Sequence, residues 1–450
     1  MNVLSDNEIL NYALQNGIID INTIQTQIEM RERKKYLNMH KYEIWQGKND
    51  LWYSYLPDEK KGRRLIKRKS QQEIENVVID YYRVHDETEK EKKRIEKITL
   101  YSIFPEWIRF KQIHTDSTSY INRITVDWNK FYAKDKEFIN MPLKDMNKVF
   151  LDEWAHGMIK KYDLTKKAYY NMSIILRQCL DFAVEKGYLP ENEFAKVKIN
   201  TKLFRRTKKK TSDTQVYNQQ EEENLIKDMI RRFKNNMKST APLAVMFQFE
   251  TGLRIGEICA VKMSDIEGRY IHIQRQEVRE FEQVDSFHTK FKCFKIVEYT
   301  KSEDGFRDVY LTDLALKIIE IAQYINRHNG EKNPEGFIFF KDGSNINHYS
   351  IQAMIKRGCE AVNMDIKTSH KIRKTYISTL IDSGLNIDEI RRMVGHSDER
   401  TTYGNYCFNR LTNKQTENMI ENALNKQKVI KSNQIFYFEN YEKPSVYAEN

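Results

Sequence analysis

The chain has 450 residues, more than one typical hydrophobic core holds, so we expect two or three domains. Its formal net charge of +11 favours a polyanionic partner, although an ordinary basic surface would produce the same sum. No apolar run approaches the roughly 20 residues that a membrane span requires, and the N-terminus lacks the layout of a signal peptide. These features exclude a membrane protein and predict a cytoplasmic one.

The five cysteines are odd in number and scattered along the chain, at Cys179, Cys259, Cys293, Cys359 and Cys407. No two of them lie at the spacing of metal ligands, so the sequence indicates neither a zinc site nor a disulfide framework. We therefore expect reduced thiols and no bound metal.

The N-terminal region divides into a helical segment and a small sheet. Residues 1–39 are predicted to be helical and have no role that we can assign. In residues 40–85, stretches rich in β-branched and aromatic residues alternate with turn-like segments, which predicts a three-stranded antiparallel meander. A capping box of Ser70 and Glu73 then begins a helix whose apolar face would cover one side of the sheet.

The third predicted strand, residues 63–69, is strongly basic. Its five cations are Arg63, Arg64, Lys67, Arg68 and Lys69. A sheet face of this charge density can lie along DNA and contact phosphates or base edges. A solvated edge strand, protected from aggregation by its charges, explains the same pattern equally well.

The middle of the chain is predicted to be helical. Residues 86–99 are rich in charge and poor in apolar side chains, which indicates a helical or flexible linker. Residues 100–200 carry apolar stripes at helical spacing and predict a domain of four or five helices. We interpret the aromatic residues of these stripes as core and not as stacking platforms for bases.

A second basic segment follows at residues 201–214, where no acid separates the cations Lys202, Arg205, Arg206, Lys208, Lys209 and Lys210. Because like charges at this density resist packing, we predict a linker. It could be an ordinary solvated hinge, but its place between two DNA-binding candidates favours contact with a phosphate backbone.

Residues 215–425 are predicted to be a third, mainly helical unit with a small antiparallel sheet. A strand is expected at 270–274 and a hairpin at 296–310, turning at 303–305, before a tail at 426–450. The complete chain is thus expected to be a multidomain α+β protein, with a small three-stranded sheet plus helix, an all-α domain and this last unit.

The third unit carries four short motifs with ionisable side chains. In TGLRIGE, Glu257 lies one helical turn after Arg254 and can orient a guanidinium that binds two phosphate oxygens. In YTKSEDGFR, Lys301 next to a tight turn could donate a proton to a departing alkoxide. An intrahelical ion pair and an exposed hairpin lysine are the ordinary alternatives.

The other two motifs supply imidazoles and a phenol. His370 and Arg373 of HKIR share one face at the start of a helix, where the dipole favours an anion. GHSDERTTYGNY places His396 after a helix end and Tyr406 ten residues later. A phenol attacks only when its proton is removed or its developing charge is stabilised, which imidazoles and guanidiniums can do. Tyr403 is a rival nucleophile, and a core aromatic is the alternative reading of Tyr406.

In order and spacing, these four motifs make residues 215–425 resemble the catalytic domain of the tyrosine recombinases, the phage-integrase family. All six active-site positions of that family are filled, by Arg254, Lys301, His370, Arg373, His396 and Tyr406. Residues 100–200 resemble the family's helical core-binding domain. Residues 40–85 resemble, by pattern and not by motif, the arm-binding domain of integrases from phages and conjugative transposons.

The resemblance implies a role for each residue. Arg254 and Arg373 would bind the scissile phosphate, with Glu257 in support, and His370 would act as general acid/base. His396 would donate a hydrogen bond to phosphate, Lys301 would protonate the leaving 5′ oxygen, and Tyr406 would form a 3′-phosphotyrosine. Because the ester conserves the bond energy, the reaction requires no cofactor, metal or ATP.

The resemblance also implies partners. These are double-stranded DNA recombination sites, three further copies of the chain in a homotetramer on DNA, an excision factor and a host DNA-bending protein. The leading expectation is an integrase of a mobile element. The alternatives are a recombinase that resolves chromosome or plasmid dimers, a type IB topoisomerase-like enzyme and a non-catalytic DNA-binding protein. A metal-dependent transposase is disfavoured because no acidic triad stands out.

Overall fold

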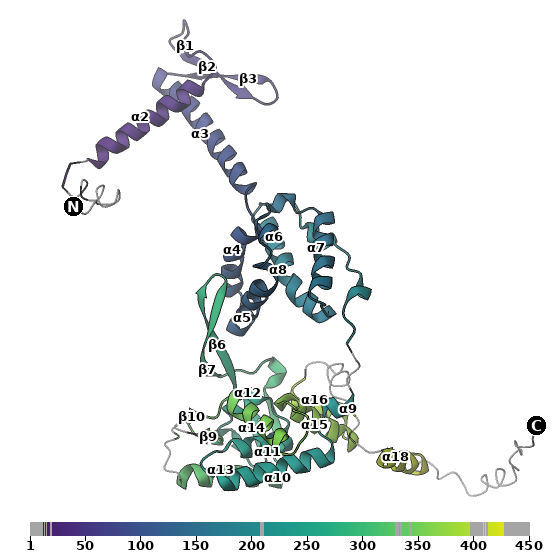
Figure 1. The fold of residues 1–450 in the computed structure, drawn as a ribbon. Coiled ribbons are helices and arrows are strands. Elements are labelled where there is room, and N and C mark those ends of the chain that lie inside the picture. Colours follow the sequence, from purple (N-terminus) through teal and green to yellow (C-terminus); the bar gives the residue numbers. More distant parts are fainter. Residues whose placement is uncertain are drawn as a thin grey trace, which may run out of the picture. The chain divides into compact units, whose positions relative to one another are not determined.

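The computed structural model describes residues 20–207, 211–328, 333, 335–341, 344–396, 408, 410 and 413–426, together with 12, 14 and 16–18. The chain splits into two compact units, one of residues 1–115 and 124–205 and the other of residues 116–123 and 206–450 (Figure 1). None of the helices in the described part combines the length and apolar character that a membrane crossing needs.

The first unit begins with a helix and a three-stranded antiparallel sheet in the order β1-β2-β3, which confirms the predicted meander. The elements are α2 (Ile21–Met39), β1 (Trp45–Gln46), β2 (Trp52–Asp58), β3 (Gly62–Arg68) and α3 (Gln71–Ile95). Ser70 caps α3 by accepting from the Glu73 backbone N–H, and α3 contacts both β2 and β3. The predicted linker at 86–99 is helical over most of its length, because α3 continues to Ile95 with ion pairs along its exposed side.

The remainder of this unit is a helical bundle, as predicted. Its helices are α4 (Leu100–Ile113), the end of α5 (Thr118–Asp127), a π-helical turn (Trp128–Tyr132), α6 (Lys136–Asn140), α7 (Lys148–Lys161) and α8 (Lys166–Glu185). The residues of α5 up to Arg123 are counted with the second unit. Aromatic side chains fill its interior: the rings of Phe104 and Trp128 stack at 4.0 Å, and those of Phe138 and Trp154 at 4.2 Å. This packing supports their interpretation as core.

The second unit is built around α11 (Ala241–Thr251), whose residues are almost all buried. Around α11 lie α10 (Gln219–Asn235), α13 (Asp313–His328), α14 (His348–Ala361) and α15 (Ser369–Asp382). The other helices are α9 (Ser212–Gln215), α12 (Ile255–Ala260), α16 (Ile387–Val394) and α18 (Asn413–Lys426).

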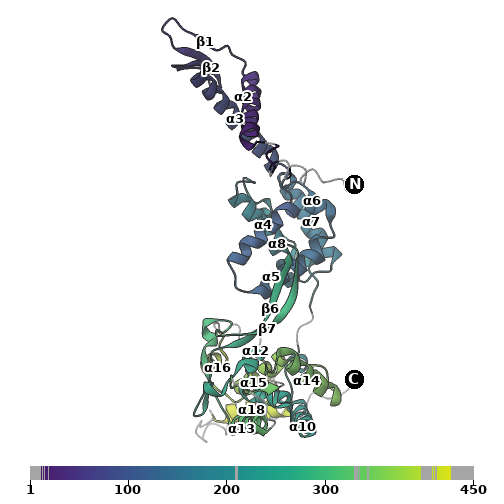
Figure 2. The same ribbon diagram turned by 90° about the vertical axis from the view of Figure 1, so that its left-hand side faces the viewer.

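In the described part of this unit, three small antiparallel sheets accompany the helices, in the orders β4-β5-β8, β6-β7 and β9-β10. Their strands are β4 (Ile266–Glu267), β5 (Tyr270–Ile273), β6 (Gln276–Asp285), β7 (His288–Val297), β8 (Arg307–Tyr310), β9 (Phe340–Lys341) and β10 (Ser344–Asn345). Figures 1 and 2 both show β6 and β7 side by side as a long hairpin.

The hairpin predicted at 296–310 is wrong in its pairing. β7 pairs with β6, whereas β8 pairs with β5 in the register Ile271↔Val309. The residues between β7 and β8 form a loop that contains a single 3-10 turn, Glu303–Gly305. Turn residues predict where the chain reverses direction, but not which strand the next segment pairs with. Here β8 pairs with β5, which precedes β6 and β7 in the sequence.

Candidate active site

A pocket of about 560 Å³ in the second unit brings together five of the six residues that the sequence singled out. Arg254, Lys301, His370, Arg373 and His396 all line it. They come from the start of α12, the β7–β8 loop, the first turn of α15 and the end of α16. Tyr406 and its rival Tyr403 lie outside the described residues.

Arg254 stands at the position that precedes α12, with an extended backbone. Its Nη1 donates to Glu257 Oε1 at 2.8 Å and its Nη2 to the Gly395 carbonyl at 2.7 Å. Its own backbone N–H donates to Glu257 Oε2 at 2.8 Å. The predicted pairing of Arg254 with Glu257 is therefore present, and it fixes the guanidinium at the pocket wall.

A residue that sequence reasoning missed, Arg307, lies behind this pair. Its guanidinium contacts both carboxylate oxygens of Glu257, with Nη2–Oε2 at 2.7 Å and Nη1–Oε1 at 3.0 Å. Burial would raise the pKa of Glu257, but Arg307, Arg373 and Arg254 outweigh it and lower that pKa to about 2. Arg307 ends the YTKSEDGFR motif, but nothing in that motif indicated its pairing with Glu257, which stands 50 residues earlier.

Arg307 also joins two loops that border the pocket. It donates to the Gly305 carbonyl at 2.9 Å and to the Met393 carbonyl at 2.8 Å. The backbones of these two loops approach each other closely at Gly395, whose φ is +63°. A Cβ added to Gly395 would lie 2.5 Å from the Asp304 carbonyl oxygen. Gly395 thus both ends α16, as predicted, and lets the loop of Lys301 approach the loop of His396.

Arg373 is almost wholly buried, with 1% of its surface exposed. It donates to the Gly252 carbonyl at 2.8 Å and also to the Val394 carbonyl, and its Nη2 lies 3.2 Å from His396 Nε2. Backbone carbonyls therefore orient this guanidinium, and it reaches the pocket next to the His396 imidazole.

Both imidazoles are held neutral. Burial, and then the charges of Arg373 and Arg254, lower the pKa of His396 to about 3. Desolvation, and then the charges of Lys374 and Arg373, lower the pKa of His370 to about 4. Because His370 is exposed, the neighbouring cations contribute more to this lowered pKa than burial does. A neutral imidazole can accept a proton at neutral pH.

Lys301 is exposed and lies in the β7–β8 loop, not at the tip of a hairpin. Thr368 precedes α15 and makes no capping hydrogen bond through its side chain. His370 nevertheless lies in the first turn of α15, as predicted.

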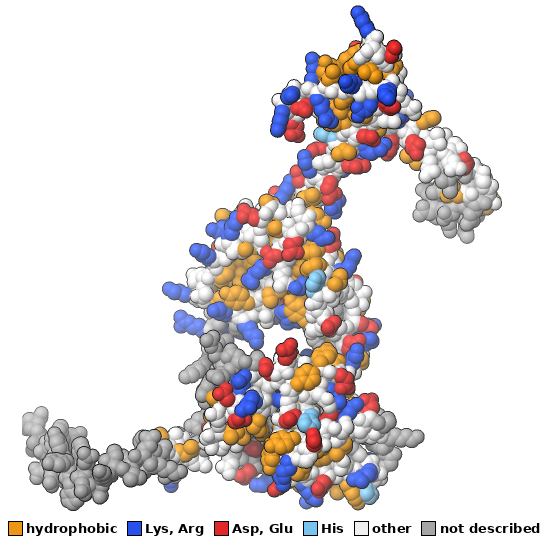
Figure 3. Space-filling model, turned by 180° about the vertical axis from the view of Figure 1, so that it is seen from behind, with side chains coloured by type: hydrophobic (Ala, Val, Ile, Leu, Met, Phe, Trp, Pro, Cys, Tyr) orange, Lys and Arg blue, Asp and Glu red, His pale blue; other side chains and the backbone are white. Residues whose placement is uncertain are grey.

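The five predicted cations of residues 63–69 are all exposed, and within the described part of the chain none takes part in an ion pair that the structure shows. The register pairs Arg64 with Leu56, which is buried, and places Arg63 and Lys67 on the opposite face. That face also carries aromatic rings, and the Arg63 guanidinium lies 4.4 Å from the Tyr55 ring centroid. Figure 3 shows lysine and arginine side chains clustered around this sheet.

The basic linker is more ordered at its start than predicted. Lys202 lies in a 3-10 turn (Thr201–Leu203), Phe204 is buried against the Tyr169 ring, and the Arg205 backbone N–H donates to the Leu164 carbonyl. Apolar packing by Phe204 therefore outweighs charge repulsion there. Arg206 is exposed. Lys208, Lys209 and Lys210 lie outside the described residues.

Comparisons with known proteins point in one direction. Residues 215–413 match the model of the phage integrase family. The chain is 23% identical over 307 residues to a XerC-like tyrosine recombinase of Caldanaerobacter subterraneus subsp. tengcongensis, covering 64% of this chain and 74% of the relative. It is 27% identical over 206 residues to the integrase of a Staphylococcus phage, covering 42% of this chain and 55% of that integrase.

Among solved structures, the integrase of transposon Tn1549, in complex with a circular intermediate DNA, is similar with a TM-score of 0.55 at 17% sequence identity. The match covers 72% of this chain and 99% of that chain. This likeness establishes a shared fold.

Proposed function

Residues 215–413 belong to the phage integrase family of tyrosine recombinases, enzymes that cut and rejoin DNA, and from this premise we propose that the chain is a site-specific integrase acting through a 3′-phosphotyrosine. The observation that carries the proposal is the pocket in which two guanidiniums, two neutral imidazoles and a lysine face one another. Few reactions other than phosphoryl transfer use that set of groups together.

In the proposed reaction, Arg254 and Arg373 bind the non-bridging oxygens of the scissile phosphate. Both guanidiniums are already oriented, by Glu257 and by backbone carbonyls, so little reorganisation is needed as charge develops in the transition state. His396, which adjoins Arg373, adds a hydrogen bond to the same phosphate.

Proton transfer is assigned to two groups. His370, whose pKa is lowered to about 4, is neutral at pH 7 and accepts the proton of the Tyr406 phenol. Tyr406 oxygen then bonds to phosphorus while the bond from phosphorus to the 5′ oxygen breaks, and Lys301 protonates that leaving oxygen. The phosphotyrosine ester retains the bond energy until a 5′ hydroxyl of partner DNA attacks it, so no metal or ATP enters the reaction.

The remaining segments are proposed to hold DNA. Residues 40–85 would form the arm-type DNA-binding domain and residues 100–200 the core-binding domain, with the basic segment 201–214 between it and the catalytic domain, 215–425. Strand exchange would take place in a homotetramer on two double-stranded sites, with an excision factor and a host DNA-bending protein as further partners. The Tn1549 protein, which shares the fold, is itself an integrase in complex with DNA.

Integration and excision of a mobile element is the favoured biological role, because the basic N-terminal sheet adds a DNA-binding unit that simple dimer-resolving recombinases usually lack. Dimer resolution is the second candidate, and relaxation of supercoils by a type IB topoisomerase-like enzyme the third. An assay with two cognate sites separates recombination from relaxation.

The decisive experiment is a suicide-substrate trap. Nicked DNA carrying the end of the element is incubated, without added metal, with wild type, Tyr406→Phe and Tyr403→Phe. We expect a covalent protein–DNA band that is lost only in Tyr406→Phe. Loss only in Tyr403→Phe would move the nucleophile within the same family, and tight DNA binding without any band would refute the catalytic proposal.

A further inference from the structure

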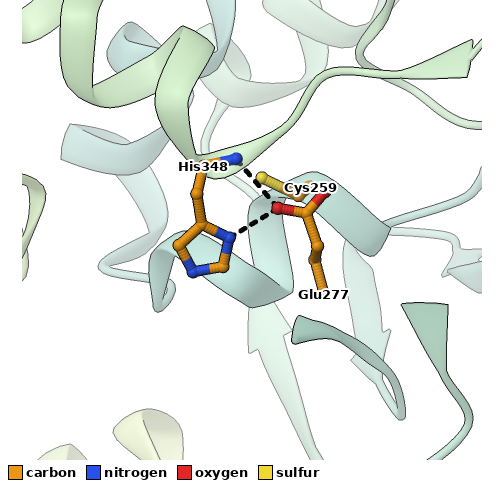
Figure 4. A group of neighbouring side chains, drawn as sticks. All are labelled: Cys259, Glu277 and His348. Carbon is orange, nitrogen blue, oxygen red and sulfur yellow. Dashed lines mark hydrogen bonds and ion pairs between the residues drawn. The ribbon is translucent and has the colours of Figure 1, made fainter. Parts of the chain in front are cut away.

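Three side chains that do not line the pocket converge from three different elements (Figure 4). They are Cys259 of α12, Glu277 of β6 and His348 at the start of α14, and their ligand atoms all lie within 4.8 Å of one another. Cys259 and Glu277 are buried, whereas His348 is partly exposed. The sequence showed no metal-ligand spacing here because the three positions are far apart in the chain.

The carboxylate of this cluster lacks the partner that similar groups have. Within the described residues, four carboxylates are buried, and three of them form ion pairs with arginine: Asp228, Glu257 and Asp265. Glu277 instead accepts from the His348 backbone N–H at 2.8 Å and from Asn345 Nδ2 at 3.1 Å, and His348 Nδ1 lies 2.5 Å away. The ion pair of Glu277 is thus with a histidine, which is charged only when protonated, whereas an arginine or a bound cation would compensate a buried carboxylate at any pH.

We propose that Cys259 Sγ, the Glu277 carboxylate and His348 Nδ1 bind a thiophilic divalent cation, by their chemistry Zn²⁺. Thiolate, imidazole and carboxylate are the ligands that Zn²⁺ takes in proteins, at bond lengths of about 2.0–2.3 Å. Ligand atoms around one such ion lie roughly 3–4 Å apart, so small side-chain movements would complete the site.

Charge and protons balance for this ion. On binding, the Cys259 thiol releases its proton to solvent. The proton that lies between His348 Nδ1 and Glu277 in the metal-free cluster also leaves Nδ1, and the ring takes one proton on Nε2 instead, so that the Nδ1 lone pair can bind the metal. The two positive charges of the ion then equal the negative charges of the Cys259 thiolate and Glu277, which leaves the buried site neutral. The His348 side chain is partly exposed, and we assign the fourth ligand position to water.

The surroundings hold the ligands in place. The Phe294 ring stacks on the His348 imidazole at 5.7 Å with an interplanar angle of 8°, and Asn345 holds the second oxygen of Glu277. α12 and β6 touch beside the cluster, since a Cβ on Gly256 would lie 2.7 Å from the Glu277 carbonyl oxygen. The ion would therefore fasten β6 to α12, the short helix that Arg254 precedes, in a structural role separate from phosphoryl transfer.

The full-length protein, freed of metal by dialysis against a chelator, is titrated with Co²⁺ as the spectroscopic probe. Wild type should show tetrahedral d–d absorption and a thiolate-to-cobalt charge-transfer band that saturate together, and Zn²⁺ should displace the cobalt and raise the Tm. Cys259→Ser and His348→Asn should each abolish the band or weaken binding by about tenfold or more.

Cys293→Ser is the matched control, because Cys293 also contacts a carboxylate, Glu280 at 3.8 Å, but no third metal-ligating side chain joins this pair among the residues that the structure describes. It should bind cobalt as wild type does. The proposal is overturned if wild type shows no charge-transfer band, or if Cys259→Ser retains it. Since His348 is partly exposed, His348→Asn should fold even if Cys259→Ser does not, and a normal band in His348→Asn would equally refute the site.

Discussion

Glu257 and Arg307 form a buried bidentate ion pair behind the pocket. This pair positions Arg254, which is proposed to bind the phosphate. The same carboxylate accepts from Arg254, so Arg307, Glu257 and Arg254 form a continuous row from β8 to the pocket wall. Because Arg307 also donates to Gly305 and Met393 carbonyls, it ties the loops of Lys301 and His396 to the same carboxylate.

Removing Arg307 should therefore damage both stability and cleavage. Arg307→Ala leaves Glu257 buried with one arginine fewer, and breaking such a pair costs about 3–5 kcal/mol. We expect a destabilisation near 3 kcal/mol in urea unfolding, because Arg254 remains, and at least a tenfold slower formation of the covalent intermediate, as about 1.4 kcal/mol lost from the transition state would cause.

Arg307→Lys and Arg269→Ala serve as comparisons. Lysine keeps the charge but not the two-pronged geometry, so it should restore stability more than cleavage. Arg269 pairs with Asp313 at the exposed surface, where solvent screens the pair, so its removal should leave stability almost unchanged. Wild-type cleavage by Arg307→Ala would contradict the positioning role.

The depressed imidazole pKa values predict a stability that falls in mild acid. An unfolded chain takes up a proton on each histidine below about pH 6.5, whereas folded His370 and His396 do so only near 4 and 3. Between these values the unfolded state binds more protons, so stability decreases as pH falls. His396→Gln should reduce the loss between pH 7 and pH 5 by on the order of 2 kcal/mol, measured by urea unfolding.

His272 provides the control of opposite sign. Its hydrogen bond to Asp308 raises its pKa, so its contribution is present at low pH and is lost as pH rises. His272→Gln should leave the acid loss intact or make it slightly larger. An unchanged pH dependence in His396→Gln would show that His396 is not held neutral in the folded protein.

Gly395→Ala should separate backbone strain from close contact. Its φ of +63° and the Asp304 oxygen at 2.5 Å both oppose a side chain, whereas Gly384 has a φ of +82° with nothing within 4 Å. Gly384→Ala should thus cost about 1–2 kcal/mol from strain alone and cleave normally. Gly395→Ala should cost more and slow cleavage, as measured by unfolding and the covalent trap. Equal effects of the two substitutions would show that the contact is unimportant.

The basic strand should contact DNA through one face. Arg63 and Lys67 lie on the face opposite the buried Leu56, so Arg63→Gln and Lys67→Gln should each lower the salt slope of DNA binding by about one. Arg64→Gln and Arg68→Gln change the same charge on the side that α3 contacts, and should alter the slope less. The salt slope is measured by DNA-binding titrations at several salt concentrations, with DNA from the element's arm region. Equal slopes for all four variants would indicate that the strand is a solvated edge strand that does not contact DNA through one face.

Local features were predictable from the sequence because they depend on residues only a few positions apart. The pairing of Arg254 with Glu257, the place of His370 and Arg373 in one helical turn, and the end of α16 at Gly395 all follow from helix geometry and glycine conformation. The meander at the N-terminus follows in the same way from alternation and turn residues.

Relationships between distant segments were decided only by the tertiary structure. β8 pairs with β5 instead of β7, Arg307 meets Glu257, and Glu277 meets Cys259 and His348. Each depends on how α12 and the sheets pack around the buried helix α11, and no period or spacing in the chain encodes that packing. The sequence by itself therefore determined which groups are available for chemistry, and the packed core decided which of them face one another.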